Sequence, residues 1–210
     1  MSLSKRDQKI QSVLTSKVRV MSFQQLAHAF FDGNEASANR RLGQLVDKGI
    51  LTENRLLARV LPSPVQPLYV WEPGFPEPAF EHHSRLLKQR WSRLAPRRVT
   101  TFMAAERFSR LVGRRAVGRL KHPLQVSHDL GLASVFLFFL HYHPSVALRW
   151  VGEDFLAACT MRARGVPDAV IISNGTAPEM AVELGGVYSA KRLYKFHRYC
   201  FARELIYEVW

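Results

Sequence analysis

The sequence predicts an α+β protein with two domains. Its 210 residues are enough for two small domains. Apolar residues recur at helical spacing through the first fifty positions, and short apolar runs bounded by turn residues dominate the last third of the chain. Prolines crowd the segment 72–79 between these parts. The predicted divisions are a first domain over 1–75, a linker and basic helical segment over 76–122, and a second domain over 123–210.

The first domain is predicted to hold three helices followed by a hairpin. Ser22 is a typical N-cap for the second helix, and Gly49 is a typical terminator for the third. A loop rich in proline, serine and glutamine separates the two strands. The predicted elements are helices over 5–15, 23–31 and 36–48 and strands over 55–61 and 68–71. This order resembles a winged helix-turn-helix domain, an arrangement that many DNA-binding proteins share.

The third helix has a polar face that suits the major groove of DNA. Arg40, Arg41 and Gln44 lie on the side opposite the apolar residues Leu42 and Leu45. Arginine binds guanine edges or phosphates, and glutamine binds adenine. We therefore predict that these three polar residues contact double-stranded DNA. The alternative is a solvated helix face in a small domain that contacts only protein.

The distribution of charge also favours a polyanionic partner. The chain has 30 Lys and Arg against 17 Asp and Glu, a net charge of +13. The segment 81–122 alone carries 12 basic and 2 acidic side chains, which is typical of a surface for a nucleic-acid backbone. An acidic membrane would attract it too, and a solvated face is the remaining alternative. The candidate DNA-binding residues in this segment are Arg97, Arg98, Arg114 and Arg115.

Cysteine use and hydropathy indicate a soluble, cytoplasmic protein. Cys159 and Cys200 are too few for a disulfide framework and lack metal-type spacing. The longest apolar stretch, 130–140, is too short to cross a bilayer. We therefore expect no membrane partner.

Two carboxylates near the C-terminal end indicate phosphate chemistry or its remnant. Asp168 stands at the entrance of one short apolar strand, and Glu183 stands inside the next. Neighbouring strands would place these acids side by side as ligands for Mg²⁺ over a phosphodiester. Glu153, at the end of an earlier strand, is the third predicted metal ligand.

The second domain is predicted to follow the order α-β-β-β-α-β. Its predicted elements are helices over 127–142 and 189–203 and strands over 146–151, 169–172, 180–184 and 205–209. The order resembles the core of the PD-(D/E)XK nuclease superfamily, and Asp168 and Glu183 fall at the positions of its two acids. The resemblance implies a Mg²⁺-dependent phosphodiesterase site if the site is active.

Short motifs narrow the resemblance. They are LKHPLQVSHDL at 120–130, WVGE at 150–153, PDA at 167–169, and Glu183 followed by KRLYKFHRY at 191–199. Together they are similar to the replication-relaxation family of plasmids and mobile elements, which places a winged helix before a nuclease-like domain. The resemblance implies a role in plasmid replication, DNA relaxation or transfer.

One position departs from the superfamily pattern. The third strand should read acid, any residue, lysine, but Gly185 stands where the lysine belongs. Glycine cannot orient water or offset charge that develops on phosphate. Lys191 is the predicted replacement from the following helix, and Lys195 is the alternative. If neither reaches the acids, the site is degenerate and its acids are ordinary structural residues.

Three functional hypotheses follow. We expect first a DNA-binding accessory protein of a mobile element, with a degenerate nuclease-like domain and no chemistry of its own. The second is a Mg²⁺-dependent DNA endonuclease or nickase that uses Asp168, Glu183 and Lys191. The third is a winged-helix transcriptional regulator whose C-terminal domain senses a ligand or dimerises, and a homodimer is left open.

Overall fold

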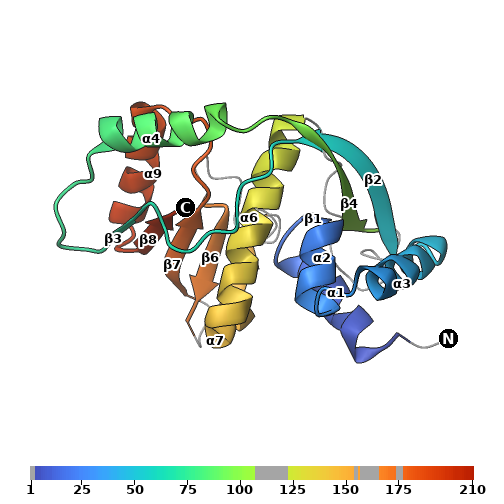
Figure 1. The fold of residues 1–210 in the computed structure, drawn as a ribbon. Helices are drawn as coiled ribbons and strands as arrows, with labels where there is room; N and C mark the ends of the chain where they lie inside the picture. The colour runs from blue at the N-terminus through green and yellow to red at the C-terminus, as the bar shows by residue number, and fades with distance from the viewer. Residues whose placement is uncertain (1–2, 107–122, 154–155, 157–165, 174–176) are drawn as a thin grey trace. The chain divides into compact units, whose positions relative to one another are not determined.

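The computed structural model describes residues 3–106, 123–153, 156, 166–173 and 177–210. It contains helices and two separate β-sheets, which confirms the α+β fold class (Figure 1). The chain divides into two compact units: unit 1 is Met1–Val60 with Pro96–Leu137, and unit 2 is Leu61–Ala95 with Phe138–Trp210. Within the described ranges, no helix has the length and apolar character needed to cross a membrane.

The predicted helices of unit 1 are confirmed as α1 (Lys5–Ser16), α2 (Phe23–Phe30) and α3 (Glu35–Asp47). Helix α1 starts with a reciprocal cap, in which the Ser4 hydroxyl and the Asp7 carboxylate each accept a hydrogen bond from the other residue's backbone N–H. Helix α2 has the predicted cap at Ser22. Helix α3 is followed by Gly49, whose φ of +65° favours glycine. These local signals fix the helix ends.

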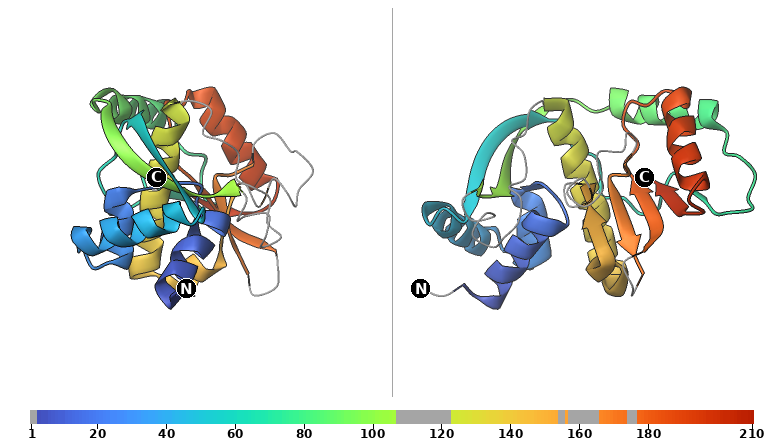
Figure 2. Two further views of the ribbon diagram at one scale, coloured as in Figure 1. Left: turned by 90° about the vertical axis from the view of Figure 1, so that its right-hand side faces the viewer. Right: turned by 180° about the vertical axis from the view of Figure 1, so that it is seen from behind.

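Unit 1 has a three-stranded antiparallel sheet. Its strands, in spatial order, are β1 (Met21–Ser22), β4 (Arg97–Ala104) and β2 (Leu51–Ala58). All eight residues of β2 pair with β4, from Leu51 opposite Ala104 to Ala58 opposite Arg97. The two strands form a long curved ribbon, cyan and green in Figure 2. The stretch that forms β4 was expected in a basic helical segment, and its run Val-Thr-Thr favours a strand instead.

The predicted hairpin between strands at 55–61 and 68–71 is wrong. Strand β2 pairs with β4, whereas β3 (Tyr69–Trp71) pairs with β8 (Ile206–Val209) in the sheet of unit 2. Prolines at 62, 64 and 67 cannot donate to a strand ladder, so the chain leaves the first sheet after Ala58.

Helix α6 (Pro123–Tyr142) contributes its residues up to Leu137 to unit 1. The Gln25 amide of α2 donates to the Leu130 carbonyl at 2.8 Å and to the Ser134 hydroxyl at 2.9 Å. Arg19 forms an ion pair with Asp129 at 3.2 Å. The core between the sheet and α6 consists of Val20, Ala58, Met103, Val126 and Leu130.

Unit 2 is built on a five-stranded sheet. Its strands, in spatial order, are β3, β8, β7 (Pro178–Glu183), β6 (Ala169–Ile172) and β5 (Trp150–Gly152). The predicted antiparallel pairing of β6 with β7 is confirmed. Strands β7 and β8 are parallel. A parallel pair needs a crossover connection, which α9 (Ala190–Phe201) supplies.

The strand predicted over 146–151 is mostly wrong. Helix α7 (Pro144–Arg149) occupies its first part, and only Trp150–Gly152 extend as β5. Pro144 stands in the first helical turn, where its missing N–H costs no hydrogen bond and its fixed φ suits a helix. This helix has six residues, too short for a clear periodic pattern.

Helices α4 (Phe80–Ser92) and α9 lie side by side in unit 2 (Figure 1). Their apolar sides meet in a cluster of Phe80, Leu87, Tyr188 and Leu193. Another side of α9 packs on the sheet, where Phe196 and Cys200 join Ala181, Tyr207 and Val209. Helix α9 therefore covers the sheet face to which Ala181 points.

Each unit is made of two chain segments, and the segments of the two units follow one another in turn along the sequence. The ends of these segments differ from the predicted domain boundaries at 75 and 122. The segment 61–95 stands between β2 and β4 in sequence but supplies β3 and α4 to unit 2. The three sequential domains remain a prediction.

Candidate functional site

Three acids form one row across the sheet of unit 2. Ala169 is opposite Val182 on β7 and opposite Gly152 on β5. Continuing both antiparallel registers by one residue places Asp168 opposite Glu183 on one side and opposite Glu153 on the other. The Glu153 N–H donates to the Asp168 carbonyl at 2.9 Å, which continues the ladder through this row.

Asp168 and Glu183 are linked through backbone groups. The Glu183 carboxylate accepts a hydrogen bond from the Asp168 N–H at 3.3 Å, and the Asp168 carboxylate accepts one from the Leu184 N–H at 2.8 Å. The two residues are 8% and 5% exposed. A buried carboxylate is stable only when hydrogen bonds or charges compensate for lost water. Each carboxylate therefore already accepts one hydrogen bond from a backbone N–H of the protein.

Arg192 is the basic side chain that reaches Glu183. Side chains alternate along a strand, so Glu183 points to the same face as Ala181, the face that α9 covers. The Arg192 guanidinium nitrogen Nη2 lies 4.0 Å from Glu183 Oε1. It also donates to the Tyr188 hydroxyl at 2.9 Å, and the guanidinium carbon lies 3.8 Å from the centre of the Tyr188 ring. Arg192 thus places positive charge beside the acid pair.

The Tyr188 hydroxyl lies in the electrostatic field of the same two acids. Burial is the main cause that raises the pKa of its hydroxyl, and the charges of Glu183 and Asp168 raise it further. The hydroxyl therefore stays protonated and can act only as a hydrogen-bonding group near the acids.

The position of Gly185 is closed to a lysine. A Cβ atom added to Gly185 would lie 2.3 Å from a methyl carbon of Leu87, which is fully buried in α4. The Gly185 carbonyl is also held, at 2.7 Å, by the side chains of Arg90 and Trp91. Leu87 of α4 therefore occupies the space that a side chain at position 185 would need.

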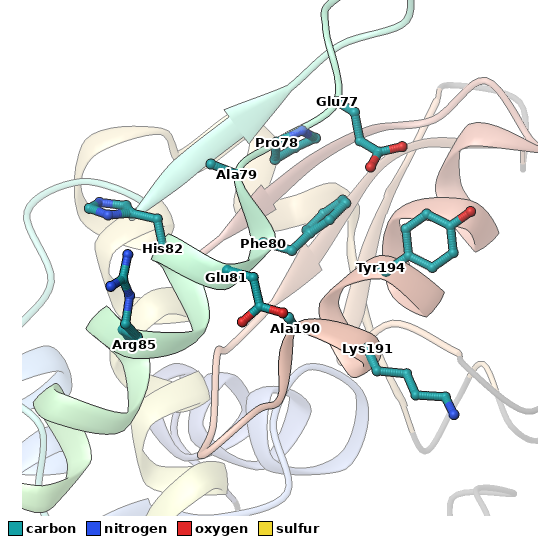
Figure 3. Close-up of a pocket in the computed structure, with 10 residues that line it drawn as sticks. All are labelled: Glu77, Pro78, Ala79, Phe80, Glu81, His82, Arg85, Ala190, Lys191 and Tyr194. Atoms are coloured by element: carbon teal, nitrogen blue, oxygen red, sulfur yellow. The ribbon is translucent and has the colours of Figure 1, made fainter.

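Lys191, the predicted replacement cation, lies in another environment. It is exposed and lines an open pocket of about 630 Å³ between the starts of α4 and α9, together with Glu81, Arg85 and Tyr194. Figure 3 shows its ammonium group directed away from the other labelled side chains. Lys195 is also exposed. The neighbouring residue Arg192 takes the place near Glu183 that Lys191 was predicted to fill.

The predicted metal ligands do not converge as a set of three. Glu153 is exposed, whereas Asp168 and Glu183 are buried. Among the residues that the structure describes, no group of three or more His, Cys, Asp or Glu side chains could hold a metal ion. Asp168 and Glu183 are the two acids that could contribute ligands to Mg²⁺.

The predicted DNA-contact residues of α3 divide into two kinds. Arg41 binds the buried carboxylate of Asp7 through two hydrogen bonds, from Nε at 3.0 Å and from Nη2 at 2.5 Å. Its Nη1 donates to the Gln44 side chain at 2.8 Å. Arg40 is exposed. Arg41 thus joins α3 to α1, and Arg40 is the exposed arginine of the predicted face.

The β2–β4 ribbon carries three further exposed arginines. Arg97 and Arg98 begin β4, opposite Ala58 and Leu57 of β2, and therefore point to opposite faces of the ribbon. Arg55 of β2 lies on the same face as Arg98, with its side chain 81% exposed and its Nε 3.6 Å from the Glu53 carboxylate. Arg114 and Arg115 lie outside the described residues. Among the described residues of unit 1, exposed arginines therefore lie on α3, on this ribbon and, at Arg6, on α1.

Comparison of the chain with protein-family models, curated proteins and solved structures found no significant match.

Sequence reasoning missed Arg192 and the anchoring of Arg41. Arg192 follows Lys191 directly, and one residue rotates a helix by about 100°. The pattern of buried residues was the available signal: Leu193 and Phe196 mark the inward side of α9, and Arg192 lies nearer to it than Lys191 does. The partner of Arg41 carried no local signal, because Asp7 is 34 residues away.

Proposed function

We propose that the protein binds double-stranded DNA through unit 1 and has no nuclease chemistry of its own. The observation that carries the proposal is that Arg55 and Arg98 are exposed on one face of the β2–β4 ribbon, in a unit whose α3 also exposes Arg40. Arginines on an exposed strand face suit phosphate contacts, and a helix face suits a groove.

The order of elements in unit 1 supports a winged helix-turn-helix interpretation. Three helices precede an antiparallel ribbon, and a short strand between the first two helices adds to its sheet. In this interpretation β2 and β4 form the wing, and the segment 61–95 is inserted at its tip. Arg40 would then face a groove together with the exposed Gln44, whereas Arg41 serves mainly to hold α3 on α1.

The order of elements from α6 to the last strand supports the nuclease-like interpretation. Helix α6, whose residues up to Leu137 belong to unit 1, is followed by strands β5 to β7, helix α9 and strand β8 of unit 2 in the α-β-β-β-α-β order, with α7 as an addition. Closure of the Gly185 position supports a degenerate site. An accessory role in replication, relaxation or transfer of a plasmid or mobile element is the biological context that the replication-relaxation resemblance implies.

Duplex binding can be tested with Arg55→Gln/Arg98→Gln, which removes the two arginines of the exposed ribbon face. We expect weaker binding to all duplex sequences alike, and a plot of log affinity against log salt that is flatter by about 2, because each phosphate contact releases about one counterion. Fluorescence anisotropy over a salt series measures both quantities.

The matched control is Lys5→Gln/Lys9→Gln, which removes two exposed charges from α1 of the same unit. An equal loss in this control would mean that net charge, rather than the ribbon, attracts DNA. Binding confined to promoter fragments with a shallow salt slope would favour a transcriptional regulator instead.

A second candidate function is a Mg²⁺-dependent endonuclease or nickase. The specific observation in its favour is that Asp168 and Glu183 are adjacent and that Arg192 supplies a cation beside them. Bound there, Mg²⁺ would supply Lewis-acid activation of a phosphodiester. Asp168 and Glu183 would hold it, and Arg192 would stabilise negative charge on the phosphate.

A nicking assay on supercoiled plasmid distinguishes DNA binding without chemistry from a metal-dependent nuclease. We expect the wild-type protein to nick no more with Mg²⁺ or Mn²⁺ than with chelator. If metal-dependent nicking occurs, Asp168→Asn should abolish it, because Asn keeps the hydrogen-bond acceptor but loses the charge, while duplex affinity stays within about twofold. Nicking by Asp168→Asn equal to wild type would identify a contaminating nuclease.

A further inference from the structure

Helix α9 carries an exposed cationic stripe made of Lys191, Lys195 and Arg198. Their spacing of four and three residues places them on one side of the helix. None of the twelve residues of α9 is Asp or Glu, so the helix itself supplies no neutralising acid. The opposite side, with Leu193 and Cys200, is buried in the core of unit 2. The stripe is therefore a fixed positive surface of this unit.

An aromatic row flanks the cationic stripe. Tyr194 and Phe201, seven residues apart on α9, are 43% and 51% exposed. The Tyr194 ring meets Phe80 edge-on at 5.8 Å, and the Phe201 ring lies 5.9 Å from Trp71. The Arg198 guanidinium carbon also lies 5.6 Å from the centre of the Phe201 ring, so a base would stack there beside a cation. Contacts with the protein thus position each ring while leaving about half of its residue surface exposed. Preset rings of this kind suit a partner that has flat apolar faces.

We propose that the cationic stripe and the aromatic row bind single-stranded DNA, with phosphates against the stripe and unpaired bases stacked on the rings. Positive charge that follows the backbone, combined with aromatic stacking, is the general mode of sequence-tolerant single-strand binding. In a duplex the bases stack on each other, so they offer no free face to these rings. The proposal rests on the proposed function in taking DNA as the partner.

The geometry of the row indicates an unstacked strand. Seven helical residues span about 10.5 Å, roughly three times the spacing of about 3.4 Å between nucleotides of a regular duplex strand. The two rings therefore take bases that are not stacked on each other. Glu77 and Glu81 line one pocket together with Lys191 and Tyr194, and their charges repel phosphate at that end of α9. The phosphates are thus expected beside Lys195 and Arg198, with the strand running from Tyr194 towards Phe201.

An anionic membrane suits this surface less well. A helix that lies on a membrane inserts its apolar face into the lipid. The apolar face of α9 is already occupied by the sheet and by α4, through Phe196 and Leu193. Only the two rings could insert, so the packing favours nucleic acid.

The test compares full-length wild type with Tyr194→Ala/Phe201→Ala by fluorescence anisotropy, on oligo(dT) of about 20 nucleotides and on a duplex of equal length. We expect the variant to bind oligo(dT) at least about tenfold more weakly, because stacking contributes strongly for each base. Duplex affinity should change less than about twofold, since unit 1 binds the duplex.

The control is Tyr142→Ala, which removes an exposed ring elsewhere in unit 2 and should leave both affinities unchanged. Tyr194→Phe/Phe201→Tyr keeps both rings and should keep oligo(dT) binding. If the alanine variant unfolds, Lys195→Gln/Arg198→Gln provides the second test, because it should flatten the salt dependence of oligo(dT) binding by about 1.4.

The outcomes distinguish this inference from the proposed function. Wild type that binds duplex but not oligo(dT) overturns the single-strand surface alone, and wild type that binds neither overturns both. Unchanged oligo(dT) affinity in the ring variant or in the lysine–arginine variant also overturns the inference. A variant that loses binding to phosphatidylserine vesicles while keeping oligo(dT) affinity would assign the surface to membranes instead.

Discussion

Replacing Gly185 with lysine, which would create the acid, any residue, lysine pattern, is expected to destabilise unit 2 rather than create a nuclease. The new Cβ would overlap Leu87, a fully buried side chain that packs in one cluster with Phe80 and Tyr188. Overpacking and the burial of an ammonium group together are expected to lower the free energy of unfolding by about 4 kcal/mol or more. Urea unfolding followed by tryptophan fluorescence measures this loss.

Gly43→Lys is the matched control, because a Cβ at Gly43 of α3 would meet nothing within 4 Å. We expect it to be neutral or slightly stabilising, since lysine favours a helix more than glycine does. Leu87→Ala in the Gly185→Lys background should make the combined loss smaller than the sum of the two single losses. A stable Gly185→Lys protein that nicks plasmid with Mg²⁺ would contradict both the packing argument and the degenerate site.

Replacing Arg41 with alanine should destabilise unit 1 by about 3 kcal/mol. The Asp7 side chain is almost wholly buried, and Arg41 supplies the charge that compensates it. Without Arg41, a buried carboxylate would stay charged with only Ser4 to bind it. Arg40→Ala is the control from the next position of α3 and should change stability by less than about 0.5 kcal/mol. Equal effects of the two changes would show that the ion pair contributes nothing.

The same ion pair predicts a dependence of stability on pH. Hydrogen bonds from Arg41 are the main cause that lowers the pKa of Asp7 to about 2. A carboxyl group with a lowered folded pKa stabilises the fold above its unfolded pKa, and this contribution is lost as the pH falls through the folded pKa. Between about pH 5 and pH 2, wild type should lose about 2 kcal/mol more than Asp7→Asn does. Urea unfolding of both proteins at the two pH values measures these losses. If wild type and Asp7→Asn lose the same free energy of unfolding between the two pH values, the prediction is contradicted.

The helices of unit 1 and α9 could be predicted because their ends carry local chemistry. Ser4, Ser22 and Ser189 cap helices through hydrogen bonds to residues three positions away, and Gly49 ends α3. The choice of a strand's pairing partner is not indicated by residues near that strand in the sequence. Nothing near β2 indicates that its partner β4 begins about 40 residues later, beyond an inserted segment of another unit.

The acid pair of the candidate site could be predicted because it depends on residues that are close in sequence. Asp168 and Glu183 fall beside and within consecutive antiparallel strands that are close in sequence, so their adjacency follows from the register of β6 and β7. The surroundings of the acids depend on α4, which is distant in sequence. Leu87 closes the position at Gly185, and the packing of the Leu193 and Phe196 side of α9 brings Arg192 rather than Lys191 near Glu183.

The central position of β4 has a consequence for expressing unit 1 alone. A fragment that ends at residue 75 would leave β1 and β2 as unpaired edges, which are templates for aggregation. Ala58 and Arg97 face each other at the end of the ladder. A two-residue Asn-Gly turn between them would close the ribbon as a tight hairpin and remove the excursion into unit 2.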